Sequence, residues 1–248
     1  HKLKYALLST YYDQIRTLLP RLVKDKGAKT VCINHQDDEF GLEVLRGAEA
    51  GIKEVGLALA ERASFKRGAT DFSSQVARLK AAHCDLVVLG TVIRETIGTL
   101  AEAQRTDFQP TFLGSVASYS DVIHKLGGKA ANGYYATMTV QTPYLDEAAQ
   151  PIRFWANKYK TRFGEDPSVF SVYGYQAVDL FIKGAQKAGR QLSTDSFVRA
   201  MDTLSAPPDI FGGPELSFSA SKRLGNNTSR LSQIQDGRWK VVSDYIKP

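Results

Sequence analysis

The sequence lacks any hydrophobic run long enough to cross a membrane. A spanning helix needs about 20 consecutive apolar residues, and the longest candidates here, such as Asp85–Leu89, are short. It also lacks a basic cluster: its 32 Lys and Arg residues exceed its 26 Asp and Glu residues, but they are spread along the whole chain. A nucleic-acid-binding surface needs such a cluster. We therefore expect a protein that neither spans a membrane nor binds nucleic acid.

Cysteine, histidine and the common catalytic motifs are scarce or absent. Cys32 and Cys84 are the two cysteines. Each lies beside a short apolar run typical of a strand, so we expect buried thiols rather than a structural bridge. The four histidines show no spacing typical of metal ligands. The motifs GxGxxG, GxxxxGK[ST], GxSxG, HExxH and CxxC do not occur, so we expect no cofactor and no common hydrolase chemistry.

What is present from Lys29 onward is a regular alternation of short apolar runs with amphipathic segments. Such a rhythm is typical of strands joined by crossover helices. It predicts an α/β fold with a parallel, doubly wound sheet. The apolar runs expected to be strands are Thr30–Asn34, Leu57–Arg62, Asp85–Leu89, Thr111–Leu113 and Tyr134–Thr137.

The pattern changes after Tyr144. Three helical patterns follow one another up to Leu204, and short β-like runs return after Phe211, with Asp236-Gly237 as a hairpin turn. A helical layer is therefore expected between two sheet-forming parts. The expected helices are Pro151–Phe163, Phe170–Ala188 and Ser196–Leu204, and the later β-like runs are Glu215–Ser219, Ser229–Gln235 and Trp239–Val242.

Three acidic residues, Asp37, Asp38 and Glu39, directly follow the first apolar run. Carboxylates at the end of a strand could form a metal site or an acid/base cluster. Acidic residues at the start of a helix are also favoured by capping and by the helix dipole alone. The sequence places no second pair of carboxylates to complete a site, which favours the capping interpretation.

Several stretches, in the same order along the chain, resemble type I periplasmic solute-binding proteins of the branched-chain amino acid class. Each motif alone is weak, but together they cover essentially the whole chain. The stretches that carry the resemblance are Lys29–Gly41, Asp71–Lys80, His83–Gly90, Gly133-Tyr134 and Tyr173–Leu180.

The resemblance implies two lobes joined by three hinge crossings, with a ligand in the cleft between them. The second lobe would comprise residues 11–138 and 211–248, and the incomplete first lobe residues 1–10 and 139–210. The crossings would lie near Ser9–Tyr12, Thr139–Tyr144 and Ile210–Gly213. The resemblance further implies a periplasmic location, a small-molecule ligand and an ABC transporter permease as partner. Two alternatives stay open: a type I ligand-sensor domain, and a hydrolase that uses the acidic cluster.

Open α/β sheets bind ligands outside the carboxyl ends of their strands, and this rule predicts the ligand site. Val116 occupies the position at which amino-acid binders of the family carry an acidic residue for the ligand's ammonium. The resemblance therefore implies a ligand other than a zwitterionic amino acid, such as an aromatic or aliphatic carboxylate. The strand ends predict eight ligand-binding residues: Phe40, Thr91, Val92, Ile93, Arg94, Ser115, Val116 and Ala117. The resemblance implies two more, Phe170 and Tyr173, on the segment that returns to the first lobe.

Each of these positions also has a plain structural interpretation. Val92, Ile93 and Val116 could be core residues, and an aromatic residue on a long helix usually is. Arg94 follows the third strand, where its guanidinium could bind a carboxylate at two points. It could equally be a solvated side chain paired with Glu95 or Asp121, while the Thr91 and Ser115 hydroxyls bind the carboxylate instead.

Overall fold

A computed structural model describes residues 3–248, which form two compact units. Of these residues, unit 1 comprises 3–9 and Thr139–Asn227, and unit 2 comprises Thr10–Met138 and Thr228–Pro248. The third crossing thus comes after Asn227, later than the expected Ile210–Gly213. The crossing comes later than expected because residues 211–227 contain a strand that pairs within unit 1.

Unit 2 is an α/β domain built on one seven-stranded sheet of order β2-β1-β3-β4-β5-β8-β9. The first five of these strands run parallel to one another. β8 pairs with β5 in antiparallel fashion, and β9 pairs with β8 in the same way. Each of the five expected apolar runs forms a strand. The strands are β1 (Val31–Gln36), β2 (Leu59–Phe65), β3 (Leu86–Gly90), β4 (Thr111–Gly114), β5 (Tyr135–Met138), β8 (Arg230–Gln235) and β9 (Arg238–Val241).

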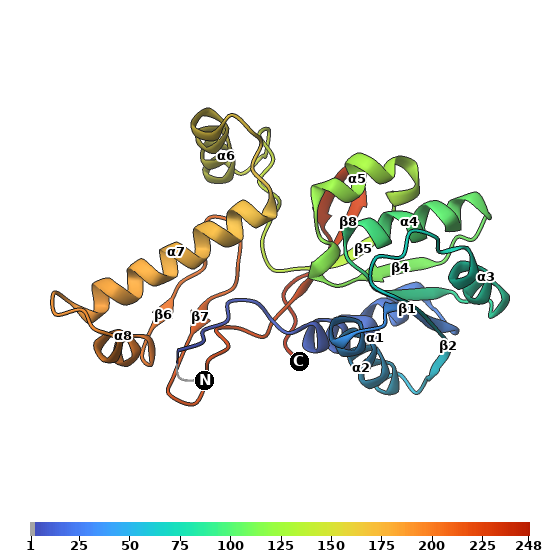
Figure 1. Cartoon of the computed structure of the whole chain (residues 1–248), viewed down its shortest axis with the longest axis horizontal. Coiled ribbons are helices and arrows are strands. Elements are labelled where there is room, and N and C mark those ends of the chain that lie inside the picture. Colours follow the sequence, from blue (N-terminus) through green and yellow to red (C-terminus); the bar gives the residue numbers. More distant parts are fainter. Residues whose placement is uncertain (1–2) are drawn as a thin grey trace. The chain divides into compact units, whose positions relative to one another are not determined.

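Helices cover both faces of this sheet (Figure 1). Alternate strand residues, such as Val31 and Ile33 of β1, pack against α1 and α2 in one buried cluster, as the two-residue period of a strand requires. Residues of the opposite parity face the other helices. The helices of unit 2 are α1 (Tyr11–Lys26), α2 (Glu39–Lys53), α3 (Ser73–Ala81), α4 (Ile93–Arg105), α5 (Asp121–Gly127) and the short η1 (Val116–Ser118) and η2 (Gly128–Ala131).

Cys32 and Cys84 form a disulfide, so the expectation of two free thiols is wrong. Cys32 lies in β1, and Cys84 lies just before β3. These strands are neighbours in the sheet although β2 separates them along the chain. The strand order brings the two Cα atoms to 5.9 Å, within the usual range for a disulfide. The order of strands is a tertiary property that the spacing of cysteines does not reveal.

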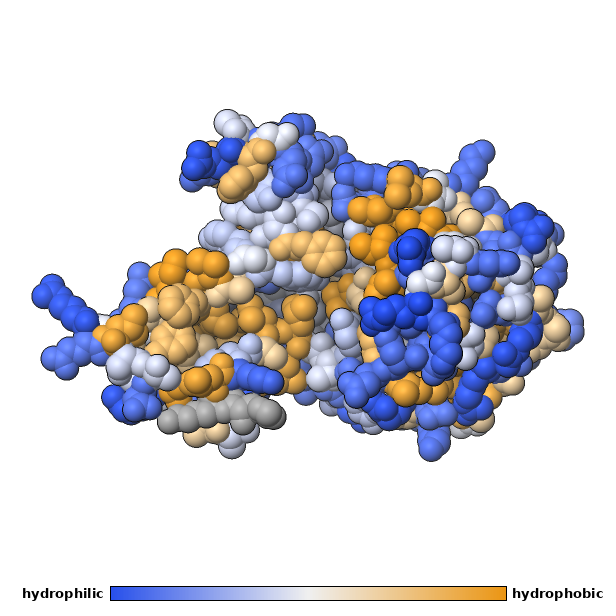
Figure 2. Space-filling model, in the orientation of Figure 1, coloured by the Kyte–Doolittle hydropathy of each residue, from blue (hydrophilic) through white to orange (hydrophobic). Residues whose placement is uncertain are grey.

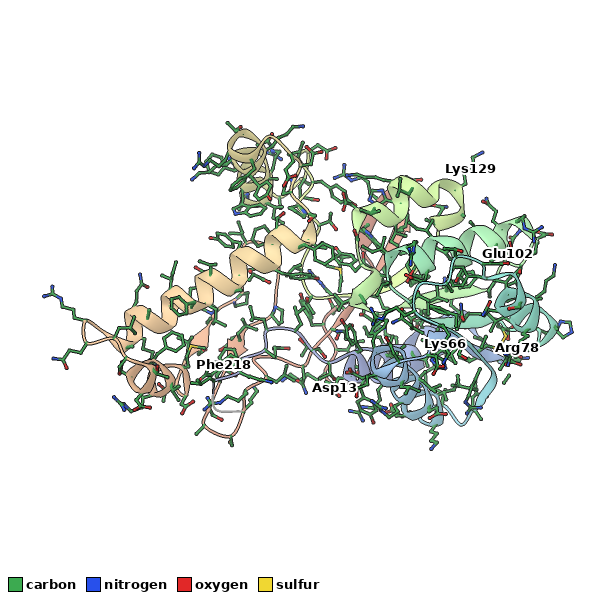
Figure 3. All side chains as sticks on the ribbon, viewed as in Figure 1. Asp13, Lys66, Arg78, Glu102, Lys129 and Phe218 are labelled. Carbon is green, nitrogen blue, oxygen red and sulfur yellow. A yellow bond between two sulfur atoms is a disulfide. The ribbon has the colours of Figure 1, made fainter. Side chains whose placement is uncertain are left out.

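Unit 1 consists of three helices and a two-stranded antiparallel sheet among its described residues. Figure 2 shows hydrophobic side chains gathered over α7 and α8 of this unit, where Phe181 and Phe197 lie 5.1 Å apart between ring centroids. On unit 1, Phe218 packs edge-on against Tyr5 (Figure 3). The elements are α6 (Gln150–Phe163), α7 (Val169–Ala188), α8 (Thr194–Met201), β6 (Ser205–Ala206) and β7 (Leu216–Ser217). Within residues 3–248, none of the helices has the length and apolar character of a membrane span.

Candidate functional site

The carboxyl edge of the parallel sheet in unit 2 collects eight of the ten predicted ligand-binding residues. They follow β1, β3 and β4, which are adjacent in the sheet, so the segments after these strands meet at one edge. The eight residues are Phe40 after β1, Thr91, Val92, Ile93 and Arg94 after β3, and Ser115, Val116 and Ala117 after β4.

The segment Thr91–Ile93, here called the β3 loop, connects β3 to α4 and includes the first residue of that helix. Thr91 is buried, whereas Val92 and Ile93 are half-buried, so the two apolar side chains are not plain core. Val92 is the N-cap of α4 and supplies no capping side chain. The helix therefore begins with backbone N–H groups that a side chain does not satisfy, at an end that carries partial positive charge. This edge favours an anionic group.

The segment Ser115–Ala117, here called the β4 loop, is held in place by a side chain of α1. The Gln14 side-chain oxygen accepts hydrogen bonds from the Val116 backbone N–H at 3.0 Å and from the Thr137 hydroxyl at 2.6 Å. The Ser115 hydroxyl accepts from the Ala117 N–H at 3.3 Å. Val116 and Ala117 are half-buried, so the β4 loop presents a second apolar patch beside that of the β3 loop.

Tyr134 lies next to the β4 loop, and the sequence does not predict it as a site residue. Its hydroxyl lies 2.6 Å from the Ser118 hydroxyl. Desolvation by burial raises the pKa of this phenol well above its ordinary value, although the hydrogen bond with Ser118 opposes the shift. Gly114 makes room for it, because a Cβ there would lie 1.8 Å from the Tyr134 oxygen. In the sequence, Tyr134 belongs only to the Gly133-Tyr134 pair that contributes to the family resemblance.

The acidic residues after β1 act as caps and ion-pair partners. Asp38 is the N-cap of α2 and accepts from the Gly41 N–H at 3.2 Å. Burial opposes its ionisation, but the bonds from Gly41, Arg67 and Gln36 outweigh that effect and lower its pKa. Asp37 pairs with Lys66, which holds the pKa of Asp37 below its usual range. Among residues 3–248, no group of three His, Cys, Asp or Glu residues could hold a metal.

Arg94 and Glu95 form an unequal ion pair at the start of α4. The Arg94 Nη2 atom lies 3.1 Å from the Glu95 Oε1 atom. The Arg94 side chain is 65% exposed, whereas the Glu95 side chain is only 3% exposed. In this structure Arg94 therefore follows the plain interpretation of a solvated arginine paired with Glu95, and Asp121 is instead paired with Lys125. Most of the Arg94 donors stay open to solvent.

The predicted set contains three aromatic residues: Phe40 at the carboxyl edge, and the two remaining members, Phe170 and Tyr173. Phe40 lies in the first turn of α2 and packs edge-on against Tyr11, with 4.9 Å between ring centroids. Phe170 and Tyr173 lie on α7 of unit 1. Phe170 is 59% exposed, and Tyr173 packs against the buried cluster that contains Phe211. The role of Phe170 and Tyr173 in a ligand site stays a prediction, since both residues belong to unit 1 and not to unit 2.

The comparisons with known proteins agree on one family. The family model described as periplasmic binding protein matches residues 5–238. The chain is 25% identical over 162 residues to the leucine-, isoleucine-, valine-, threonine- and alanine-binding protein of Pseudomonas aeruginosa, covering 65% of this chain and 42% of that protein. It is 22% identical over 228 residues to the Leu/Ile/Val-binding protein homolog 3 of Brucella melitensis, covering 91% and 60%. The chain thus spans less than two thirds of the length of either relative.

Solved structures show the same fold. A branched-chain amino acid ABC transporter protein from Thermus thermophilus with bound valine matches with a TM-score of 0.86 at 18% identity, covering 98% of this chain and 67% of that one. A substrate-binding periplasmic protein from Ralstonia solanacearum matches with a TM-score of 0.83 at 20% identity, covering 98% and 69%. These likenesses establish the type I periplasmic-binding-protein fold. The chain belongs to the periplasmic binding protein family, a family of non-enzymatic binding proteins.

Proposed function

We propose that this chain is the ligand-binding part of an extracytoplasmic solute-binding protein that delivers a small organic molecule to an ABC importer. The observation that carries the proposal is the carboxyl edge of unit 2. There the half-buried apolar residues of the β3 and β4 loops surround the uncapped start of α4. Such an edge offers apolar contact together with backbone donors, which is the usual chemistry of a small-molecule site.

The charges at this edge favour a ligand without an ammonium group. Asp37 is paired with Lys66, Asp38 with Arg67 and Glu95 with Arg94. An ammonium would have to compete with these cations for a carboxylate. A ligand carboxylate meets the opposite situation, because the α4 N-terminus and the exposed Arg94 both attract an anion. We therefore propose an aromatic or aliphatic carboxylate as ligand, with the apolar residues of the two loops in contact with its ring or chain.

A branched-chain amino acid is the second candidate ligand. It is favoured by the names of the relatives from Pseudomonas and Brucella and by the valine bound to the Thermus protein. The two candidates differ by one chemical group. Leucine and isocaproate have the same branched chain and the same carboxylate, but only leucine carries the ammonium. Valine and isovalerate form a second matched pair.

Calorimetric titration of the purified protein with both pairs tests the proposal. We expect isocaproate to bind at least about tenfold more tightly than leucine, since a buried ammonium without a carboxylate partner loses a charge-assisted bond. Isovalerate and valine should differ in the same direction. Tighter binding of leucine and valine would overturn the carboxylate proposal in favour of the amino acid. Chemical conversion of any bound ligand would overturn the binding-protein proposal as a whole.

The disulfide supports the proposed periplasmic location. Disulfides form and persist in oxidising compartments, of which the bacterial periplasm is one, and are rare in the cytosol. Both cysteines are buried, and the bond joins two segments inside the sheet of unit 2. The family and the disulfide thus favour the same compartment, and a ligand sensor in the cytoplasm is the less favoured alternative.

A further inference from the structure

The Gln14 side chain joins three segments of unit 2 that lie far apart in the sequence. It is fully buried and lies near the start of α1. Its Oε1 atom accepts from the Val116 N–H of the β4 loop at 3.0 Å and from the Thr137 hydroxyl of β5 at 2.6 Å. The chain crosses between the units after Ser9, just before α1, and again after Met138, the last residue of β5. One oxygen atom therefore links the ligand edge to the segments beside two of the crossings.

The helix that carries Gln14 packs closely against α2. Two glycines of α2 allow this approach. A Cβ at Gly47 would lie 2.7 Å from the Tyr12 carbonyl oxygen. A Cβ at Gly51 would lie 2.6 Å from the Arg16 carbonyl oxygen. Gln14 lies between these two contacts on α1, and such close packing leaves little room for its backbone to shift. The Gln14 oxygen is thus a fixed point in unit 2.

The two parts of the β4 loop are held by different contacts. At the end of the loop, the Ser118 hydroxyl donates to the Ser115 carbonyl at 3.0 Å and lies 2.6 Å from the Tyr134 hydroxyl. These contacts do not involve Gln14. The bond to Gln14 instead holds the middle of the loop, where the half-buried Val116 side chain lies at the ligand edge.

The chemistry of the two donors makes the position of Val116 depend on Gln14. A backbone N–H can only donate, so the atom that faces it must be the amide oxygen of Gln14. A hydroxyl such as that of Thr137 can rotate towards another acceptor, but the direction of the Val116 N–H is fixed by its planar peptide group. Without the Gln14 oxygen, Val116 can satisfy its N–H only if the loop itself moves.

We propose that Gln14 is a positioning residue for the ligand, which acts by fixing the backbone of Val116 at the ligand edge. Because Gln14 acts through the backbone of the β4 loop, it affects every ligand that contacts this loop, with or without an ammonium group. The effect on ligand binding rests on the proposed function. The support of the loop by Gln14 does not, so the two can be tested separately.

Amide hydrogen exchange of the ligand-free protein tests the support of the loop. Gln14→Met keeps a side chain of similar length and removes the acceptor. We expect the Val116 amide of this variant to exchange roughly five times faster, as the loss of one hydrogen bond predicts. The amides of β3, which has a strand on each side, report unfolding of the whole unit. The increase at Val116 should exceed the increase in β3.

Thr99→Val is the matched control. It removes a buried hydroxyl that accepts from the Asn34 side chain at 3.3 Å, so unit 2 loses a buried hydrogen bond that does not involve the β4 loop. The exchange of Val116 relative to β3 should stay as in the unmodified protein. Equal increases at Val116 and β3 in Gln14→Met, or a selective increase at Val116 in Thr99→Val, would overturn the proposal.

Calorimetric titration tests the effect on the ligand. The probe is whichever of isocaproate and leucine binds the unmodified protein more tightly. We expect Gln14→Met to bind it roughly fivefold more weakly, the factor that one hydrogen bond predicts, and Thr99→Val to bind it as the unmodified protein does. Unchanged affinity in Gln14→Met would overturn the role in ligand binding. If neither probe binds the unmodified protein, the proposed function fails, whereas the exchange experiment still decides whether Gln14 supports the loop.

A double variant shows whether Gln14 acts through the Val116 N–H. Val116→Pro removes this N–H, and Ser115 already has the extended backbone (φ −81°, ψ 176°) that suits a residue before proline. Addition of Gln14→Met to Val116→Pro should then weaken binding of the same probe by less than about twofold, because the bond is already absent. A further loss as large as that in Gln14→Met alone would contradict the proposal.

Discussion

Arg94 is compatible with both of the roles considered for it, as an ion-pair partner of Glu95 and as a binder of a ligand carboxylate. One of its nitrogens lies 3.1 Å from the buried carboxylate of Glu95, yet the side chain is 65% exposed. A guanidinium has five N–H donors in a planar fork, so it can hold Glu95 and still offer donors to a ligand. The ion pair with Glu95 would then orient Arg94 instead of competing with the ligand. Arg94 therefore stays the predicted partner of a ligand carboxylate.

We expect Arg94→Ala and Arg94→Lys to weaken the binding of isocaproate by about ten- to one-hundred-fold, the range for a lost bond to a charged group. Lysine cannot reproduce the fork, so both variants should lose affinity. The uncharged amide of isocaproate should bind all forms alike. Calorimetric titration provides the measurement. Arg105→Ala is the control, because Arg105 lies at the other end of α4 in an exposed pair with Glu102; an equal loss there, or none in either Arg94 variant, would remove Arg94 from the site.

At the scale of elements, Asp85 joins the segments that precede two neighbouring strands. Its Oδ2 atom accepts from the backbone N–H groups of Lys29 at 2.8 Å and Thr30 at 2.9 Å, just before β1, while Asp85 itself precedes β3. These bonds stabilise the carboxylate and lower its pKa. A carboxyl group with a depressed pKa in the folded state stabilises the fold above its unfolded pKa of about 3.9. That contribution is lost as the pH falls through the folded-state pKa.

We therefore expect Asp85→Ala to lower the free energy of unfolding at about pH 7 by roughly 1 kcal/mol, the size of a lost hydrogen bond. The difference from the unmodified protein should shrink as the pH falls below about 4. Asp85→Asn keeps an oxygen acceptor without the charge, so it should retain part of the stability. Urea unfolding at several pH values measures all three proteins. A difference that stays constant down to about pH 3 would contradict the assignment.

The elements that could be predicted from sequence are those with a regular hydrophobic period. The apolar runs of β1 to β5 were predicted in this way. The turn at Asp236-Gly237, both of whose residues have positive φ, was predicted from the Asp-Gly pair itself. The helix α1 was missed, because it lies before the alternating region and carries Pro20 in its interior, a residue that usually ends a helix. The strand β6 was missed because it has only two residues. Short or exceptional elements depend on tertiary packing more than on their own sequence.

The residues of the candidate site also fall into two groups, those that could be predicted from the sequence and those that could not. The residues after β1, β3 and β4 could be predicted, since the rule for parallel strands needs only the strand ends. Gln14, Thr96 and Tyr134 could not, because they reach the site from α1, from inside α4 and from the approach to β5. Their hydrogen bonds span up to 123 positions along the chain. A single sequence carries no signal for contacts at that separation.

At the scale of the whole molecule, the disulfide connects stability to the compartment in which the protein folds. Cys32 and Cys84 are 52 positions apart, so the bond closes a loop that contains α2, β2 and α3. Closing such a loop restricts the unfolded chain and stabilises the fold by about 2–5 kcal/mol. A domain that folds in a reducing compartment would lack this contribution. The proposed periplasmic location thus accounts for a bond that the sequence alone did not reveal.

We expect the double variant Cys32→Ala/Cys84→Ala to unfold at lower urea concentration, with a free energy of unfolding lower by about 2–5 kcal/mol. The unmodified protein in a strong reductant should approach the stability of this double variant, since the loop is then open in both, whereas reductant should not affect the double variant. Thiol labelling under denaturing conditions should find no free cysteine in protein recovered from the periplasm. Two labelled thiols in that protein, with a stability that reductant does not change, would show that the bond contributes nothing there.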